Sequence, residues 1–438
     1  MATEAEQAFC VVSNNSLYLR RAIQVHRGDR ADQGSRRVDG GCIVCEKEMT
    51  VKKSIQASVF ALAGLAAVSS FQVSADEELT IGVVSALEGP GSEWGRGVDG
   101  GTKIAAKEIN DAGGLTVNGT TYQINVRSYN DGYAASAAVS AVTRLIEQDE
   151  VNFILGPLGS GSALAVKPMY EENGILALVN SYSPKTLENV RYTYRVLPTT
   201  AEYSGPIVGW IHENHPDIKS VAIISPNDQT GWDSQKFQEA TYEKFGYDIV
   251  GTELFERSTK NFQPFVTRIM AQKPDLIELD TTPPGTAGLI IRQAREMGYQ
   301  GRFSKIGGPG VPEIVDAAGK DFAEGTIVYV AADTNNPKYQ ELEEAYAEIY
   351  SPPMNAFNVF FYDAAHMLFQ AIERAGTVED TEKVRQELEA MAPYEGMQGT
   401  LNWGGEDTYG NNHQLQTPTF VGMIKDGKEV IVNRIGVQ

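Results

Sequence analysis

The chain has 438 residues, enough for two domains with separate hydrophobic cores. Apolar residues make up 42% and charged residues 21%, which is ordinary for a folded protein and argues against intrinsic disorder. The net charge of −20, with no basic stripe in the sequence, argues against nucleic acids and anionic lipid surfaces as partners.

An export signal is predicted near the start of the chain. A basic segment with Lys52 and Lys53 precedes an apolar run over residues 55–73, and small residues follow up to Ala75. We therefore predict a signal peptide over residues 49–75, cleaved after Ala75, and an exported mature chain. The alternative is a buried helix or membrane anchor, but the apolar run is short and an acidic segment follows it at once.

Residues 1–48 match no structural pattern, and a signal behind them would be hard for an export machinery to reach. We expect translation to start at Met49; a peptide from residues 1–48 in the native precursor, seen by mass spectrometry, would contradict this. All three cysteines, Cys10, Cys42 and Cys45, lie in this segment. The pair at 42 and 45 has neither a second ligand pair for zinc nor a βαβ context for redox chemistry. The mature chain would then hold no cysteine, 28 basic and 50 acidic side chains, and a net charge of −22.

The mature chain continues as two series of alternating strands and helices. In the first series, strands are predicted over 79–85, 122–129, 151–155 and 175–179, and helices over 97–112, 134–148 and 163–173. In the second series, strands are predicted over 220–225, 248–254, 275–280, 303–306 and 326–330, with helices between them. Helices over 338–350, 356–375 and 381–391 and a set of strands from 399 onward complete the chain. This order predicts an α/β protein with doubly wound parallel sheets and right-handed crossovers.

The segment from Ile154 to Ser183 has the features of a ligand site. An apolar strand leads into a Gly/Ser turn over 156–162, where the next helix presents free N–H groups and the positive end of its dipole. The following strand ends in Asn-Ser-Tyr-Ser at 180–183. Ligands of such sheets sit beyond the carboxyl ends of the strands. The sequence therefore predicts half of a small-molecule pocket that favours an anion.

Motifs of enzymes are weak or missing in the sequence. The glycines at 89, 91 and 95 are spaced one residue too long for a dinucleotide fingerprint, and no acidic residue ends a second strand about 20 positions on. There is no G-x-S-x-G elbow, and the histidines of the mature chain lack a metal-binding spacing. We expect no catalytic residue, no metal and no cofactor.

Several segments together resemble the leucine/isoleucine/valine-binding protein family, the type I periplasmic solute-binding proteins of ABC importers. The matching segments are EGPGSEWG at 88–95, KEINDAGG at 107–114, the run over 129–163, ENGILALVNSYSP at 172–184, the segment 225–231, GLIIRQAREMG at 288–298 and NVFFYDAAHML at 358–368. The resemblance implies two lobes joined by a three-strand hinge near 199–202, 332–335 and 417–421. The implied lobes are residues 76–200 plus 334–418, and residues 201–333 plus 419–438.

The resemblance also implies which residues bind the ligand. In the first lobe, a serine hydroxyl and backbone N–H groups hold the ligand's carboxylate, and an aromatic residue of the first loop covers it. The corresponding residues of this chain, together with a further tyrosine placed beside them, are Trp94, Ser160, Gly161, Ser162, Ser181, Tyr182 and Ser183. In the second lobe, residues after three strands complete the site. The corresponding residues and their neighbours are Asp228, Thr230, Asp280, Thr281 and Pro309.

This chain departs from the family on the second-lobe side. Pro309 stands where amino-acid receptors place an acidic residue for the ammonium, and a cysteine pair of many relatives is replaced by Tyr133 and Gly159. The residues expected to bind a ligand's carboxylate thus match the family pattern, and those expected to bind its ammonium do not. An α-amino acid would need Asp228 or Asp280 for its amine, although an aspartate after a strand is commonly a helix cap; an acid or amide without an amine is the alternative.

We therefore expect a monomeric periplasmic substrate-binding protein that captures an amino acid, amide or organic acid and delivers it to membrane ABC permease subunits. It is expected to bind no nucleic acid. A ligand sensor or regulator on the same fold is the alternative function, and an α/β enzyme is less favoured because fold alone does not fix function. Asp363, inside an apolar helix, is predicted to be a buried structural residue and not a ligand contact.

Overall fold

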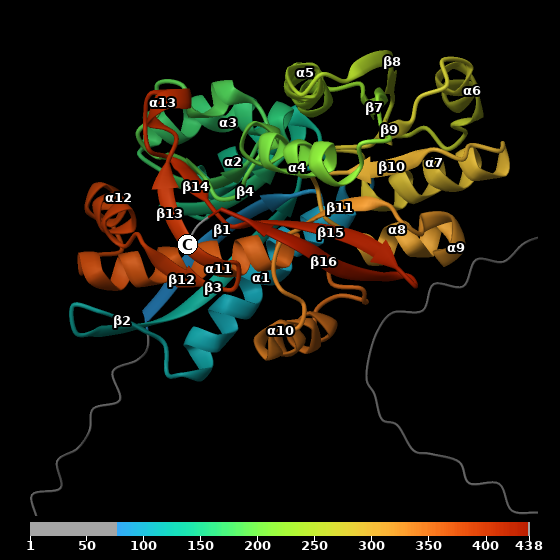
Figure 1. The fold of residues 1–438 in the computed structure, drawn as a ribbon. Helices are drawn as coiled ribbons and strands as arrows, with labels where there is room; N and C mark the ends of the chain where they lie inside the picture. The colour runs from blue at the N-terminus through green and yellow to red at the C-terminus, as the bar shows by residue number, and fades with distance from the viewer. Residues whose placement is uncertain (1–76, 437–438) are drawn as a thin grey trace, which may run out of the picture. The chain divides into compact units, whose positions relative to one another are not determined.

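Two mixed β-sheets organise residues 77–436, the part of the chain that the computed structural model describes (Figure 1). The first sheet has the strand order β12-β13-β14-β6-β5-β4-β1-β3-β2. Its strands are β1 (Glu77–Ser85), β2 (Leu115–Val117), β3 (Thr120–Asn130), β4 (Phe153–Leu158), β5 (Leu176–Asn180), β6 (Thr193–Arg195), β12 (Tyr394–Gly396), β13 (Gly399–Gly404) and β14 (Gln414–Gln416). The centre of this sheet, from β6 to β3, is parallel, and its strands β1, β4 and β5 are largely buried and mostly apolar.

The second sheet has the order β16-β15-β11-β10-β9-β7-β8. Its strands are β7 (Ser220–Pro226), β8 (Asp248–Phe255), β9 (Leu276–Glu278), β10 (Arg302–Lys305), β11 (Ile327–Val330), β15 (Thr419–Lys425) and β16 (Lys428–Ile435). The prediction of doubly wound α/β lobes is confirmed, but both sheets carry antiparallel strands at their edges. Tight turns at Asn118-Gly119 and Asp426-Gly427 allow this, because two-residue turns join only antiparallel neighbours.

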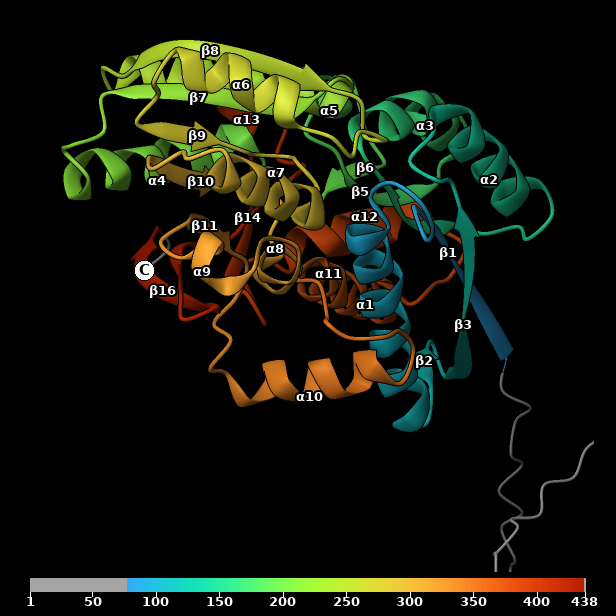
Figure 2. The same cartoon turned by 90° about the vertical axis from the view of Figure 1, so that its right-hand side faces the viewer.

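Helices cover both faces of the sheets. They are α1 (Ser92–Asp111), α2 (Ala135–Glu147), α3 (Ser160–Asn173), α4 (Thr200–Asn214), α5 (Gln229–Lys244), α6 (Gln263–Ala271), α7 (Pro284–Glu296), α8 (Val311–Ala318), α9 (Lys320–Ala323), α10 (Pro337–Ala347), α11 (Phe357–Ala375), α12 (Thr381–Ala390) and α13 (Glu406–Tyr409), with a 3-10 turn at Pro184–Leu187. Helices α1 and α11 lie side by side in both views (Figures 1 and 2). Gly101 allows this close approach, since a Cβ there would lie 2.3 Å from the backbone oxygen of Asn358.

The chain passes between the two sheets three times: after β6, after β11, and between β14 and β15. We call the first sheet with its helices the first lobe, and the second sheet with its helices the second lobe; the residue boundaries proposed above stay a prediction. Asp363 accepts hydrogen bonds from the backbone of Met397 and from the backbone and side chain of Gln398, at 2.8–3.2 Å. Its predicted structural role is therefore supported by its surroundings.

Two helices begin earlier than predicted. Helix α1 starts at Ser92 and not near 97, because Gly91 takes a left-handed conformation with φ of 78° and turns the chain directly into the helix. Helix α3 starts at Ser160 and not at 163, so the predicted turn residues Ser160, Gly161 and Ser162 form its first turn. Serine and glycine are tolerated there because the first N–H groups of a helix have no partner within it.

Within residues 77–436, no helix combines the length and apolar character needed to cross a membrane. In the same residues, no cluster of three or more His, Cys, Asp and Glu side chains could hold a metal ion. The predicted signal peptide, the segment 1–48 and the three cysteines lie outside the described residues.

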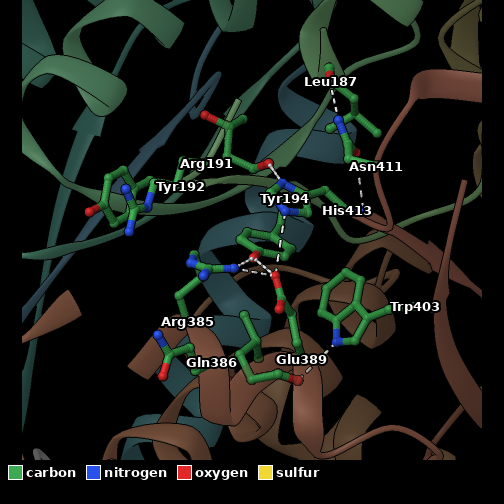
Figure 3. A network of polar contacts seen from close by, with 12 residues as sticks. Leu187, Arg191, Tyr192, Tyr194, Arg385, Gln386, Glu389, Trp403, Asn411 and His413 are labelled. Atoms are coloured by element: carbon green, nitrogen blue, oxygen red, sulfur yellow. Dashed lines mark hydrogen bonds and ion pairs between the residues drawn. The ribbon is translucent and has the colours of Figure 1, made fainter. Parts of the chain in front are cut away.

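A polar network ties α12 to the edge of the first sheet (Figure 3). The carboxylate of Glu389 accepts hydrogen bonds from Tyr194 and Arg385 and lies 3.5 Å from Nε2 of His413. The ring of His413 stacks on Tyr194 with centroids 3.9 Å apart, and the Nε1 of Trp403 donates to the carbonyl of Leu388 at 2.9 Å. Burial opposes the charge of Glu389, but the bonds from His413 and Tyr194 and the charge of Arg385 lower its pKa to about 2.

We expect Glu389 to contribute to stability at neutral pH and to lose this contribution in acid. A carboxyl whose pKa is lower in the folded state than in the unfolded chain stabilises the fold above its unfolded pKa of about 4.3. The free energy of unfolding should therefore fall as the pH drops from about 5 toward 2. Glu389→Gln should remove part of that pH dependence, as measured by urea unfolding at a series of pH values.

The matched control is Glu387→Gln on the same helix, which removes an exposed ion pair with Arg374. That variant should keep most of the acid loss. The Glu389 effect should also be smaller than its pKa alone implies, because 36% of this side chain is exposed to solvent. Equal pH profiles for wild type and Glu389→Gln would contradict the role assigned to this carboxylate.

Candidate functional site

The two lobes meet at a small cavity beyond the carboxyl ends of their parallel strands. Its lining residues are Trp94, Tyr133, Leu158, Asn180, Tyr182, Thr230, Thr281, Gly308 and Phe357. The cavity has a volume of about 10 Å³. This is near the space of a single water molecule, so the lobes are closed on each other.

The first-lobe half of the site is built on the start of α3. Strand β4 ends at Leu158, Gly159 turns the chain with φ of 98°, and the helix begins at Ser160. The hydroxyl of Ser160 accepts hydrogen bonds from the backbone N–H groups of Tyr182 at 3.0 Å and Ser183 at 3.2 Å. Ser160 thereby joins the ends of two neighbouring strands. The first N–H groups of the helix remain the donors available to an anion.

A side chain of the second lobe reaches this helix start. The Oγ1 of Thr230 accepts a hydrogen bond from the backbone N–H of Ser160 at 3.0 Å and lies 3.2 Å from the Ser160 hydroxyl. Thr230 comes from the first turn of α5 in the second lobe. A hydroxyl oxygen of one lobe thus occupies the position at which the other lobe offers N–H donors.

Trp94 lies in the first turn of α1 and not in the preceding loop, which corrects its predicted position. Its indole N–H donates to the carbonyl of Pro309 at 3.3 Å, and its ring stacks on Phe357 with centroids 5.7 Å apart. The carbonyl of Pro309 also accepts a hydrogen bond from the side chain of Asn355 at 3.2 Å. Trp94 therefore lines the cavity from the first lobe while it contacts the second.

Tyr133 packs against two glycines, Gly91 and Gly159. A Cβ at Gly91 or Gly159 would lie 2.8 Å and 2.7 Å from its ring, so the two glycines leave the space that the tyrosine occupies. Its hydroxyl lies 3.0 Å from the Oγ1 of Thr230 and accepts a hydrogen bond from Arg257 at 3.2 Å. The guanidinium of Arg257 also stacks on the ring, 4.3 Å from the centroid. Burial raises the pKa of Tyr133 to about 12, so the hydroxyl keeps its proton at neutral pH.

Asp228 and Asp280, the two candidates for an ammonium, are both engaged elsewhere. Asp228 caps α5 by accepting from the backbone N–H of Gly231 at 3.0 Å, and it forms an ion pair with Arg257. Asp280 is buried and accepts from the hydroxyls of three residues and from one backbone N–H. These donors are Tyr203 at 2.8 Å, Ser234 at 2.8 Å, Thr200 at 3.0 Å and the N–H of Thr281 at 2.7 Å. Neither aspartate lines the cavity.

Some of the remaining predicted residues support the turn after β5, and others line the cavity. Ser181 bonds to Thr186 at 2.6 Å, and the carbonyls of Ser181 and Ser183 accept from Arg195, so these two serines support the turn after β5. Tyr182 and Thr281 line the cavity. Pro309 contributes its carbonyl to Trp94, as described above.

Other lining residues lie partly inside and partly outside the predicted segments. Asn180, in the predicted segment 180–183, lines the cavity from the end of β5. Gly308 lines it from the segment 308–310, which the family resemblance implies, whereas Leu158 and Phe357 were not predicted as site residues. Behind Gly308 lies Lys305, a buried lysine at the end of β10.

The ammonium of Lys305 donates to the carbonyls of Gly307 and Gly308 and lies 5.5 Å from the centroid of Trp94. Burial lowers the pKa of Lys305 to about 8, against the effect of nearby carboxylates. Lys305 is thus a cation that fixes the loop on the second-lobe side of the cavity. A lysine at the end of a strand is usually exposed, so the sequence did not indicate that Lys305 is buried and fixes this loop.

Two α/β lobes that meet at a helix N-terminus define a class of protein that encloses a small ligand between lobes. A family model described as periplasmic binding protein matches residues 78–429, and the chain therefore belongs to the periplasmic binding protein family. It is 29% identical over 365 residues to Leu/Ile/Val-binding protein BraC3 of Rhizobium johnstonii. The matched region covers 82% of this chain and 94% of that protein.

Solved structures share the fold. A leucine-binding protein LivK from Thermotoga maritima superposes with a TM-score of 0.71 at 24% identity, over 82% of this chain and 98% of that one. A solute-binding protein of an ABC transporter from R. palustris, solved in complex with benzoate, superposes with a TM-score of 0.70 at 17% identity, over 82% and 96% of the two chains. At these identities the likeness establishes the fold alone.

Proposed function

We propose that this protein is the periplasmic substrate-binding protein of an ABC importer, which closes its two lobes around a small carboxylate-bearing solute and delivers it to membrane permease subunits. The observation that supports this most is the contact between Thr230 and the N–H of Ser160 at the start of α3. A solute carboxylate would replace the Thr230 hydroxyl as the acceptor at this helix start, where the dipole favours negative charge.

The relatives support the class of ligand. The protein from Rhizobium johnstonii is named for leucine, isoleucine and valine, and the structure from R. palustris holds benzoate. These ligands share a carboxylate and an apolar body. A periplasmic location follows from the family, and the predicted signal peptide would supply the export step. A sensor on the same fold is the second candidate, which adjacent genes for permease subunits would disfavour.

Solute binding is tested by thermal unfolding in the presence of a panel of amino acids, amides and aromatic acids. A ligand that binds only the folded protein raises its free energy of unfolding, by about 2.7 kcal/mol at a concentration 100 times its Kd. The unfolding temperature rises as a result. We expect at least one carboxylate of the panel to stabilise the protein. No stabiliser across the panel would contradict the proposed function, and stabilisation by amines that lack a carboxylate would contradict the site.

Arg257 is expected to set how readily the lobes close. It belongs to the second lobe, 8% of its side chain is exposed, and its cross-lobe contact is the ring and hydroxyl of Tyr133. A buried cation–π contact contributes on the order of 1–2 kcal/mol. Arg257→Gln should therefore favour the open form and weaken the apparent affinity for any stabiliser by roughly tenfold, because affinity scales with the closed fraction.

Small-angle X-ray scattering measures this change as a larger radius of gyration of the protein without ligand. The matched control is Arg268→Gln, which removes an exposed ion pair with Glu253 inside the second lobe. It should leave both the radius of gyration and the affinity unchanged. An Arg257 variant that scatters and binds like the wild type would show that this contact does not hold the lobes together.

A further inference from the structure

Two buried polar side chains of the cavity have no hydrogen-bond partner among the described residues. Asn180 of the first lobe is 1% exposed, and both its amide oxygen and its amide nitrogen are unpaired. Thr281 of the second lobe is 2% exposed, and its hydroxyl is unpaired. Both line the same cavity. Because buried polar groups are almost always paired, these two are placed to bond to something that enters between the lobes.

The backbone of Thr281 supports a functional role for this position. Its φ is +56°, in the left-handed region that a β-branched residue rarely adopts. Its N–H is fixed by the carboxylate of Asp280 at 2.7 Å. Backbone strain of this kind persists where the surroundings enforce it, and it concentrates at ligand sites.

The cavity offers no carboxylate to an ammonium group, because none of its nine lining residues is acidic. Of the acidic groups nearby, Asp228 is paired with Arg257, and Asp280 is surrounded by hydroxyl donors. Asp131 accepts from the N–H of Tyr133 and Glu313 from Asn355, both at 2.9 Å, and the second carboxylate oxygen of each has no partner among the described residues. None of these four carboxylates lines the cavity.

A cation already lies on the second-lobe side. The ammonium of Lys305 is held by two carbonyls directly behind Gly308, and a Cβ at Gly308 would lie 3.1 Å from its Nζ. A second positive charge, on the ligand, would lie beside this cation with no carboxylate lining the cavity to pair with it. Burying an unpaired charge is strongly unfavourable.

Most of the remaining lining is aromatic or aliphatic: Trp94, Phe357, Tyr182 and Leu158 all contribute to it. Such walls favour an apolar body on the ligand. Asn180 offers both a donor and an acceptor, and Thr281 offers a hydroxyl, so one neutral hydroxyl group of the ligand can donate to one and accept from the other.

We propose that the solute is an amine-free hydroxy acid, with its carboxylate at the start of α3, its apolar body among the aromatic rings and its hydroxyl bonded to Asn180 and Thr281. This rests on the proposed function, because it assigns the solute class of the same site. It makes Asn180 and Thr281 the residues that determine specificity, and it excludes α-amino acids as the preferred ligands.

Titration calorimetry with matched compounds tests the assignment. One series is phenylalanine, 3-phenyllactate and 3-phenylpropionate; a second is leucine, 2-hydroxy-4-methylpentanoate and 4-methylpentanoate; a third pair is benzoate and 4-hydroxybenzoate. Within at least one series, the hydroxylated acid should bind roughly tenfold tighter than its counterpart without the hydroxyl, since an unpaired polar site penalises the analogue that lacks the group. Where that series contains an amino acid, the amino acid should bind more weakly still.

Tighter binding of phenylalanine or leucine than of the matching hydroxy acid would overturn the inference while leaving the proposed function intact. Equal binding of the hydroxylated and plain acids in every series would overturn the roles of Asn180 and Thr281. No binding by any compound of these series, together with no stabiliser in the wider panel, would overturn the proposed function itself.

Variants locate the hydroxyl contact. Asn180→Leu and Thr281→Val keep the size of each side chain and should bring the affinity ratio of hydroxylated to plain acid close to one. The matched control is Asn358→Leu on α11: Asn358 is also buried with both amide atoms unpaired, but it does not line the cavity. The control should keep the wild-type ratio. A wild-type ratio in folded Asn180→Leu and Thr281→Val proteins would contradict the inference.

Discussion

Ser160→Ala is expected to weaken solute binding by about 2 kcal/mol, roughly 30-fold in Kd. The hydroxyl of Ser160 accepts hydrogen bonds from the N–H groups of Tyr182 and Ser183 at 3.0 and 3.2 Å. The backbone N–H of the same residue donates to the Thr230 hydroxyl. Loss of the Ser160 hydroxyl leaves two buried donors without an acceptor and loosens the strand end against the start of α3. Titration calorimetry with the best stabiliser of the panel measures the change.

Ser140→Ala serves as the control for this variant. Ser140 lies on α2, and its hydroxyl donates to the carbonyl of Ser136 at an exposed position of the same lobe. Its affinity should equal that of the wild type. Because Ser160→Ala also removes structural hydrogen bonds, its unfolding temperature should fall, and binding should be measured well below it. An unchanged Kd in the folded variant would remove Ser160 from the site.

Asp280→Asn is expected to lower the free energy of unfolding by about 2–3 kcal/mol, with a smaller effect on binding. The carboxylate accepts from Tyr203, Thr200 and Ser234 and from the N–H of Thr281, which ties α4 and α5 to the end of β9. An amide has only one acceptor oxygen, so its NH₂ group would face hydroxyls that now donate. Urea unfolding measures the loss.

This variant also decides between two roles for Asp280. If Asp280 held a ligand ammonium, the substitution would remove binding of amino acids and change stability little. Asp248→Asn, at an exposed position at the start of β8 in the same lobe, is the control and should change neither quantity. A stable Asp280→Asn protein with lost binding would contradict the structural role.

Local rules describe the start of α3 better than they describe the second-lobe side of the cavity. A Gly/Ser turn between an apolar strand and a helix creates free N–H donors whatever the rest of the chain does. The start of α3 was predicted three residues late, yet the predicted turn residues form it. Trp94, predicted in the loop before α1, lies on that helix and lines the cavity.

The second-lobe half depends on contacts between distant segments, which local rules do not describe. In the sequence Asp280 was a candidate for a ligand's amine or for a helix cap, but Tyr203 and Thr200 of α4 reach it across 77 and 80 residues of chain. Tyr133 and Arg257 are 124 residues apart and come from different lobes. Lys305 is buried because Gly307 and Gly308 fold back onto its ammonium, a turn that no spacing in the sequence announces.

A crystal structure with the most stabilising carboxylate of the panel would locate the solute directly. We expect its carboxylate between the lobes, within hydrogen-bonding distance of the N–H of Ser160 and close to the Thr230 hydroxyl. We also expect no acidic side chain in contact with the solute. A solute bound outside the cleft, or one whose carboxylate points away from the start of α3, would show that this site does not bind the solute as proposed.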